Sequence, residues 1–177
     1  KRWMQTLPTI QKLSQAKPER VLKLWEGLGY YSRARNLQLA AKQIVTKYQG
    51  VFPKNPAVIR KLPGIGPYTT GAISSIAFGL PEPIVDGNVT RILTRIFGID
   101  KNPKDKATQI KLWSLAKTLV CSTEDCSSLN QSLMELGATV CHVRKPECHN
   151  CPVMRSCTTK RTNMIHLVPA KGKPTRH

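Results

Sequence analysis

The sequence predicts an all-α fold in two small helical lobes. Apolar residues recur at the three- and four-residue spacing of an amphipathic helix in one segment after another, and no convincing run of alternating polar and apolar residues predicts a strand. Glycine and proline stand where these segments begin and end. A chain of 177 residues, 40% of them hydrophobic, is long enough for one compact core or for two lobes that share a cleft.

Helical periodicity divides the chain into a core, a cysteine-rich loop and a tail. Helices are expected over 18–28, 34–48, 58–62, 67–77, 87–97, 110–120 and 129–138. These segments place a helical core at 1–140, with a helical hairpin near 56–79. A cysteine-rich loop follows at 141–157. The remaining residues, 158–177, are basic, contain proline and lack periodicity, so we expect a linker or tail there.

The charge of the chain is strongly positive. Lysine and arginine total 28 against 10 acidic residues, a formal net charge of +18. This surplus favours a polyanionic partner, since lysine and arginine neutralise phosphates and release counterions. Charge alone leaves open a nucleic-acid enzyme, a ribosomal type of protein and a protein of membrane surfaces. No apolar run approaches the roughly 20 residues that span a bilayer, and the first residues lack the apolar region of a secretory signal.

Four of the six cysteines are grouped near the C-terminus: Cys141, Cys148, Cys151 and Cys157. Their spacing, C-x6-C-x2-C-x5-C, contains a single CxxC, whereas structural zinc sites commonly pair two. Thiolates at compact, unequal spacing can wrap an iron–sulfur cubane, which we favour over zinc. Disulfides are a third alternative, and a basic chain without a secretory signal argues against them. Cys121 and Cys126 lie outside the group and are expected to be unpaired thiols.

Two short motifs precede the cysteines. Residues 62–66 (LPGIG) join two expected helices by a turn whose glycines permit positive φ, and backbone N–H groups at the start of the next helix can bind a phosphate oxygen. Asp86, in the VDGNV motif of residues 85–89, stands directly before a helix, where its carboxylate accepts backbone N–H bonds. Each motif alone has an ordinary structural explanation, a helix–helix turn and an N-cap.

The longer string LPGIGPYTTGAI at 62–73, then VDGNV, then the cysteine spacing, resembles in content and order the endonuclease III and MutY superfamily of DNA glycosylases, and most closely its MutY adenine glycosylases. The resemblance runs from Arg2 to about Lys160. It implies a helix-hairpin-helix DNA glycosylase fold with a C-terminal [4Fe–4S] cluster loop held by the four grouped cysteines. It also implies base excision repair, by hydrolysis of the N-glycosidic bond of adenine mispaired with 8-oxoguanine or guanine.

The resemblance implies catalytic roles for three residues. Asp86 corresponds to an aspartate whose anion opposes the positive charge that develops on the sugar as the base departs. Asn88 supports it by hydrogen bonding. Tyr68 stands where endonuclease III-like lyases carry a nucleophilic lysine, which implies a monofunctional glycosylase without a Schiff base. The alternative for Tyr68 is a packing role.

The resemblance also implies a DNA-binding surface. Tyr30, in residues 28–36 (LGYYSRARN), corresponds to a tyrosine that wedges into the duplex beside the mispair, as base flipping requires, and a core position is the alternative. Gln131, in residues 129–137 (LNQSLMELG), is implied to face the adenine pocket. The other expected contacts are Ser32, Arg33, the hairpin glycines Gly64 and Gly66, and Arg144 and Lys145 between the first two cysteines.

The resemblance suggests that the chain is a fragment. Its first residues resemble the segment just after the family's catalytic helix, which bears the glutamate that protonates the departing adenine, and its last residues resemble the linker to a Nudix-like domain. We therefore expect the isolated chain to bind DNA and to excise adenine poorly. Two alternatives stay open: a glycosylase of the same fold with another substrate, such as mismatched thymine or an oxidised base, and a non-catalytic iron–sulfur DNA-binding module.

The expected partner is double-stranded DNA that contains an adenine mispair. No membrane association is expected, and the chain is expected to act as a monomer. The expected location is the cytoplasm in a bacterium, or the nucleus or mitochondrion in a eukaryote.

Overall fold

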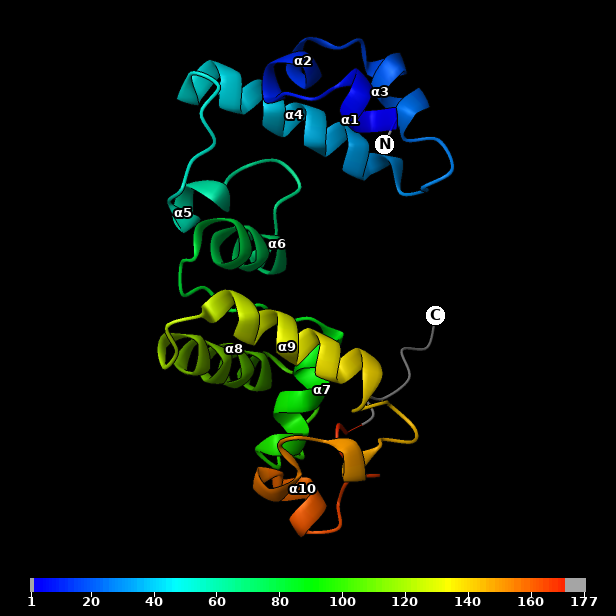
Figure 1. The fold of residues 1–177 in the computed structure, drawn as a ribbon, viewed down its shortest axis with the longest axis vertical. Coiled ribbons are helices and arrows are strands. Elements are labelled where there is room, and N and C mark those ends of the chain that lie inside the picture. The colour runs from blue at the N-terminus through cyan, green and yellow to red at the C-terminus, as the bar shows by residue number, and fades with distance from the viewer. Residues whose placement is uncertain (1, 171–177) are drawn as a thin grey trace. The chain divides into compact units, whose positions relative to one another are not determined.

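The protein is helical throughout the part described by the computed structural model, residues 2–170 (Figure 1). Within this range every regular element is a helix and no strand occurs, which confirms the predicted all-α fold. The chain divides into two compact units, Lys1–Thr70 and Gly71–His177, in agreement with the two predicted lobes. None of the helices in residues 2–170 has the length and apolarity needed to cross a bilayer.

The first unit is built on one long helix. The short helices α1 (Arg2–Thr6), α2 (Ile10–Gln15) and α3 (Pro18–Leu24) precede α4 (Tyr31–Tyr48), and both α2 and α3 pack on α4. Thr9 caps α2 by accepting the Lys12 N–H at 3.1 Å. The core beneath these helices is a cluster of buried apolar side chains: Leu7, Leu13, Val21, Ala34 and Ala41. Burying each large one stabilises the unit by about 1.5–3 kcal/mol.

One predicted helix of this unit is shorter than expected. Residues 18–28 were expected to form a helix to Leu28, but α3 ends at Leu24 and hydrogen-bonded turns follow. The physical reason is glycine in the left-handed region: Gly27 and Gly29 have φ of 85° and 64°. Such φ values cannot continue a right-handed helix. The apolar residue Leu28, which extended the helical pattern in the sequence, is 65% exposed.

A helical hairpin ends the first unit. Its helices are α5 (Pro56–Ile59) and α6 (Pro67–Ala72), and Asn55 caps α5 by accepting the Ala57 N–H. The single helix predicted over 67–77 continues past α6 as the π-helical segment η1 (Ile73–Ala77), which belongs to the second unit. Just before η1, Gly71 in α6 lies directly against a downstream segment, because a Cβ there would collide with the Pro83 carbonyl oxygen.

The second unit packs three helices around an apolar core. They are α7 (Gly87–Ile96), α8 (Lys106–Cys121) and α9 (Cys126–Thr139), and each packs on the other two. The core contains Val89, Ile92 and Leu93 from α7 together with Leu112 and Leu133 from its neighbours. Both α8 and α9 begin before the predicted starts at 110 and 129. The earlier start of α9 follows from its cap, because the Asp125 carboxylate accepts the Ser128 N–H at 2.9 Å.

The end of the described chain is folded against α7. Two short 3-10 turns, η2 (Cys148–Asn150) and η3 (Met154–Ser156), lead to α10 (Thr158–Arg161), which packs on α7. Thr159, Ile165 and Val168 are buried. The folded unit therefore includes residues 158–170, where a linker or tail was expected. The rest of that predicted tail, 171–177, lies outside the described residues.

Candidate functional site

Asp86 is the N-cap of α7, as its place in the sequence predicted. Its backbone is extended, with φ of −102° and ψ of −171°, and its carboxylate accepts the Val89 N–H at 2.7 Å. The side chain is half-buried, so one carboxylate edge is fixed by the helix while the residue keeps access to the surface. A carboxylate at this place also interacts favourably with the positive end of the helix dipole.

Asn88 and Arg91, on the helix that Asp86 caps, are joined by a hydrogen bond. The Arg91 guanidinium donates from Nη2 to Asn88 Oδ1 at 2.8 Å and to the Gly137 carbonyl at 2.7 Å, and from Nε to the Cys141 carbonyl at 2.7 Å. Burial lowers the pKa of Arg91 from its ordinary value, with the Cys141 sulfur acting in the opposite direction. The first turn of α7 is thereby joined to the end of α9 and to the first grouped cysteine.

Arg95, one turn further along α7, is held even more tightly. It is 2% exposed, and its guanidinium donates to the Cys141 Sγ at 3.2 Å. It also donates to the carbonyls of His142 (2.7 Å), Val143 (3.0 Å) and Val168 (2.9 Å). A buried cation with a full set of acceptors avoids the penalty of an unpaired charge. Arg95 therefore fixes the start of the cysteine loop and the end of the described chain on α7.

Asn130, on α9, holds the segment that leads to Asp86. It is 1% exposed; its Oδ1 accepts the Ile84 N–H at 3.1 Å, and its Nδ2 donates to the Glu82 carbonyl and to Ser75 Oγ, both at 2.9 Å. Lys117 fixes the same segment from α8, through the Pro81 carbonyl at 2.7 Å and the Glu82 carboxylate at 2.8 Å. The segment that leads to Asp86 is thus bonded to two helices, α8 and α9.

The close approach of α9 to α7 depends on a glycine. A Cβ on Gly137 would lie 2.6 Å from the Asn88 Cβ and 3.1 Å from its Cα. Only a residue without a side chain allows α9 to lie this near to the first turn of α7.

Gln131, predicted to face a base pocket, is exposed on α9, and its amide donates to Ser127 Oγ at 3.1 Å.

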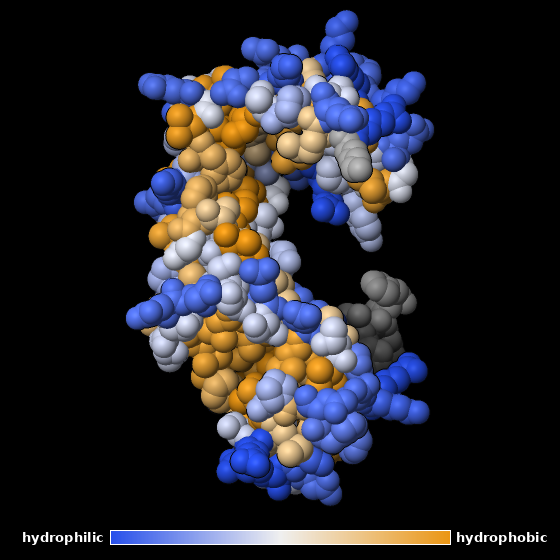
Figure 2. Space-filling model, in the orientation of Figure 1, coloured by the Kyte–Doolittle hydropathy of each residue, from blue (hydrophilic) through white to orange (hydrophobic). Residues whose placement is uncertain are grey.

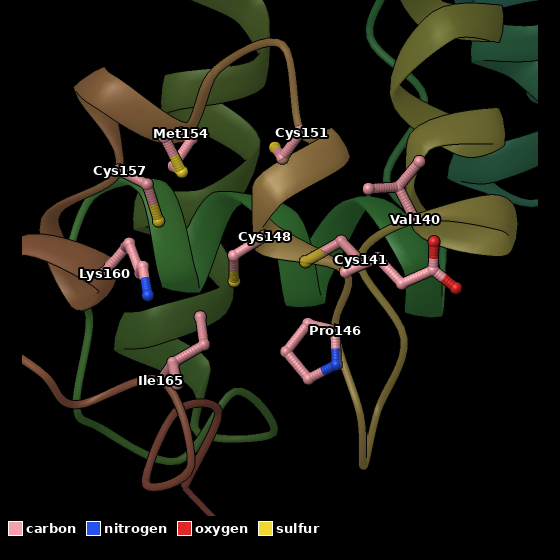
Figure 3. A pocket seen from close by; sticks show the side chains of 10 residues that line it. Val140, Cys141, Pro146, Cys148, Cys151, Met154, Cys157, Lys160 and Ile165 are labelled. Atoms are coloured by element: carbon pink, nitrogen blue, oxygen red, sulfur yellow. The ribbon is translucent and has the colours of Figure 1, made fainter.

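The four grouped cysteines line one pocket of the second unit (Figure 3). Cys141 follows α9, Cys148 begins η2, Cys151 follows η2 and Cys157 follows η3, so the loop wraps around this space. None of the four forms a disulfide bond, and apolar side chains complete much of the lining: Val140, Pro146, Met154 and Ile165. Burial raises the pKa of the Cys151 thiol, and the other three cysteines contribute in the same direction.

The pocket suits a sulfur-ligated group in its chemistry. Thiols from four positions on one wrapped loop, in a partly apolar setting, are a donor set for an iron–sulfur cluster. Within residues 2–170, no three His, Cys, Asp or Glu side chains are placed closely enough to hold a single metal ion. Arg144 and Lys145 are exposed between the first two cysteines. The loop therefore exposes two cations, Arg144 and Lys145. Arg95 fixes the start of this loop through Cys141 and His142.

The hairpin turn of the first unit is locked on α4. Gly64 has φ of 74°, and a Cβ there would lie 2.6 Å from the Cβ of Asn36. Arg60 donates to the Ile65 carbonyl at 3.0 Å and lies beside Gly66. Tyr68 follows Pro67 in the first turn of α6 and is 44% exposed. This exposure does not fit a buried packing tyrosine.

Tyr30 is the N-cap of α4 and is 81% exposed, which excludes the alternative of a core tyrosine. Ser32 and Arg33 are exposed in the first turn of the same helix. In the view of Figure 2, hydrophilic side chains, drawn in blue, line much of the outer edge of the first unit. Since Glu19 and Glu26 are the only acidic residues of the unit's sequence, the surface carries a large excess of positive charge.

Comparison with known proteins identifies the family. Residues 1–118 match the HhH-GPD superfamily of base excision DNA repair proteins. The chain belongs to this superfamily. It is 46% identical to an adenine DNA glycosylase of Arabidopsis thaliana over 89% of the chain, 45% identical to one of Homo sapiens over 90%, and 41% identical to one of Buchnera aphidicola over 97%. The chain spans 28%, 29% and 49% of these relatives, respectively.

Solved structures of the HhH-GPD fold agree with this assignment. A thermostable thymine-DNA glycosylase superposes with a TM-score of 0.80 and 29% identity, over 91% of this chain and 74% of that one. A non-covalent endonuclease III–DNA complex gives 0.74 and 26%, over 92% and 74%. The predicted helix-hairpin-helix glycosylase fold is therefore confirmed.

Sequence reasoning missed the buried partners of the site. From the sequence, Arg91 and Arg95 contribute only to the total positive charge, and Asn130 has no assigned role within residues 129–137. One signal was present: two arginines four residues apart flank the apolar pair Ile92 and Leu93 in α7 (Gly87–Ile96). Residues four apart share a helix face, so both cations had to meet the same neighbour.

Proposed function

We propose that the protein is an adenine DNA glycosylase of base excision repair, which hydrolyses the N-glycosidic bond of adenine mispaired with 8-oxoguanine or guanine. One observation supports it above the others. Asp86 caps α7 and is backed by the bonded chain of Asn88 and Arg91, in a chain whose curated relatives of 41–46% identity are adenine DNA glycosylases. This arrangement fixes a carboxylate in place before any substrate arrives.

Asp86 supplies electrostatic catalysis in this proposal. As the bond between C1′ and the base breaks, the sugar acquires positive charge, and a fixed anion beside it lowers the energy of that state. Preorganisation matters because a mobile carboxylate would have to be oriented during the reaction. Asn88, itself held by Arg91 at 2.8 Å, supports the geometry from the same helical turn.

DNA binding is assigned to both units. The hairpin with Gly64 and Gly66 would direct backbone N–H groups to a phosphate, and exposed cations such as Arg33, Arg144 and Lys145 would contact other phosphates. Tyr30 would enter the duplex beside the mispair. If about five phosphates are neutralised, log K should fall with log salt at a slope of about −4 to −5. We propose that a monomer binds double-stranded DNA, in the cytoplasm of a bacterium or the nucleus or mitochondrion of a eukaryote.

The cysteine pocket is proposed to hold a [4Fe–4S] cluster through Cys141, Cys148, Cys151 and Cys157. When bound, the cluster would tie the ends of the loop together and so order Arg144 and Lys145 for phosphate contact. Purified protein is expected to absorb broadly near 400 nm and to contain about four irons per chain. Stoichiometric zinc without iron after anaerobic purification would contradict this assignment.

A single-turnover excision panel tests the activity. Full-length protein is incubated with duplexes that differ only in the mispair, adenine opposite 8-oxoguanine, adenine opposite guanine, or thymine opposite guanine, and the released base is measured. We expect adenine release from the first two duplexes. Thymine release instead would favour the second candidate, a thymine-DNA glycosylase, which the structural likeness at a TM-score of 0.80 suggests. Binding without release of any base would indicate a non-catalytic module.

Tyr68 determines a second feature of the reaction. Because the residue is not a lysine, no amine attacks the sugar from this place. We therefore expect an abasic site as the product and no efficient trapping of a covalent intermediate by borohydride. Tyr68→Lys is expected to gain some trapping, and efficient trapping by the unchanged protein would contradict a monofunctional mechanism.

A further inference from the structure

The turn before α4 contains three residues in the left-handed region. Gly27, Gly29 and Tyr30 have φ of 85°, 64° and 45°. The conformation is ordinary for glycine and unfavourable for tyrosine, since the Cβ crowds the following carbonyl. Tyr30 is 81% exposed, so contacts of its own ring do not hold it there. The conformation must be imposed by the neighbouring residues.

Trp25 is the side chain that holds this turn. Its indole N–H donates to the Gly29 carbonyl at 2.9 Å. The Gly29 carbonyl is part of the peptide bond between Gly29 and Tyr30. The hydrogen bond therefore fixes the orientation of this peptide plane, on which the φ of Tyr30 depends. Trp25 is itself anchored, because its ring meets the Trp3 ring edge to face with centroids 5.5 Å apart and planes at 79°.

The same indole ring also holds Arg33. The guanidinium carbon of Arg33 lies 5.5 Å from the ring centroid of Trp25, within the range of a cation–π interaction. The backbone N–H of Arg33 also donates to the Tyr30 carbonyl at 2.9 Å. One side chain thus restrains both an exposed aromatic ring and the cation one helical turn beyond it.

We propose that Trp25 is a positioning residue for base unstacking, which presets the Tyr30 turn and holds Arg33 at the same time. The inference rests on the proposed DNA-binding function. An aromatic ring placed against a base stack loses less entropy on insertion when its backbone is already fixed. A cation held next to it can meet the phosphate beside the unstacked base. Trp25 needs no contact with DNA in this role.

The matched substitutions are Trp25→Phe and Trp3→Phe. Trp25→Phe keeps an aromatic face under Arg33 and removes only the indole donor and part of the ring. Trp3→Phe removes the same atoms from the partner ring, whose indole N–H has no hydrogen-bond partner among residues 2–170. Tyr30→Gly is the reference for loss of the wedge, since glycine tolerates the left-handed backbone.

Full-length protein is titrated with a duplex that carries 2-aminopurine next to an adenine:8-oxoguanine mispair. Fluorescence at saturation reports unstacking, the titration midpoint reports binding, and thermal melting reports stability. Trp25→Phe is expected to lower the unstacking equilibrium about fivefold, the effect of one hydrogen bond, with binding changed less. Trp3→Phe keeps an aromatic ring against Trp25, so it is expected to leave the fluorescence at saturation unchanged while the smaller ring lowers the melting temperature.

Three outcomes separate the possibilities. If Trp25→Phe gives full fluorescence while Tyr30→Gly loses it, the positioning role is wrong and the wedge stands. If Tyr30→Gly keeps full fluorescence, both the wedge and the positioning role are wrong, although adenine release can still show the glycosylase activity. Should Trp25→Phe fail to fold, hydrogen exchange of the unchanged protein decides: the Trp25 indole proton must exchange more slowly than that of Trp3, and equal rates overturn the inference.

Discussion

Two helices of the second unit are both capped by an aspartate. They differ in the hydrogen bonds made by the residues that follow the cap. Asp86 caps α7 through the Val89 N–H at 2.7 Å, and Asp125 caps α9 through the Ser128 N–H at 2.9 Å. Asp125 is exposed. On the helix that Asp86 caps, by contrast, Arg91 bonds Asn88 and the Cys141 carbonyl, and Arg95 bonds the Cys141 sulfur. The cap is ordinary in both places, and the buried network distinguishes the functional candidate.

The difference shows what fixes the carboxylate that we propose to be catalytic. A cap bond orients one carboxylate oxygen relative to its own helix, and nothing more. The position of the α7 start relative to the rest of the second unit is fixed by Arg91 and Arg95 on one side and by Asn130 on the other. Since electrostatic stabilisation depends on preorganisation, we expect these residues to affect the proposed catalysis without touching the substrate.

The largest effect on stability is expected at Arg95. Arg95→Met removes a buried cation and leaves three carbonyls and the Cys141 sulfur without their donor. We expect a loss of about 3 kcal/mol or more in the unfolding free energy of the second unit, measured by urea unfolding. Hydrogen exchange in residues 141–157 should also accelerate. The control is Arg161→Met, an exposed site, with a change within about 0.5 kcal/mol; equal effects of the two substitutions would contradict the account.

A smaller effect is expected at Asn130. Asn130→Ala leaves the Ile84 N–H and the Glu82 carbonyl without partners inside the unit. The expected loss is about 2–3 kcal/mol, the penalty for buried polar groups left unpaired. Asn150→Ala is the matched control, because the side chain of this exposed asparagine bonds, among residues 2–170, only the Glu147 carboxylate. An Asn130→Ala protein as stable as Asn150→Ala would show that the segment before Asp86 is fixed in another way.

The smallest effect is a pH dependence at Asp125. Hydrogen bonds from the side chain and backbone of Ser128 lower the pKa of Asp125 below its ordinary value of 3.8. A lowered folded-state pKa means that its contribution to stability is complete above the ordinary pKa and is lost as pH falls through the folded-state pKa. Asp125→Asn keeps a capping oxygen but does not titrate. Wild-type protein should therefore lose slightly more stability than Asp125→Asn between about pH 5 and pH 3; identical pH profiles would contradict the cap.

Sequence reasoning recovered the elements that depend on local or spaced patterns. The hairpin, the cap at Asp86, the exposed Tyr30 and the convergence of the grouped cysteines all follow from residue order or from resemblance. The end of α3 was missed because Leu28 continues the apolar pattern, whereas the backbone of Gly27 ends the helix. Arg95 and Asn130 were missed because their roles depend on partners 47 and 46 residues away along the chain, respectively.

The central claim is that Asp86 acts through its charge and Asp125 only through its cap. Asparagine caps helices as well as aspartate does, so Asp86→Asn and Asp125→Asn both keep the cap and remove the charge. Single-turnover excision of adenine opposite 8-oxoguanine by the full-length protein compares them directly. We expect Asp86→Asn to slow excision by about 10²–10³-fold and Asp125→Asn to remain within about twofold of wild type. An Asp86→Asn enzyme within about threefold of wild type, or equal losses in both variants, would contradict the account.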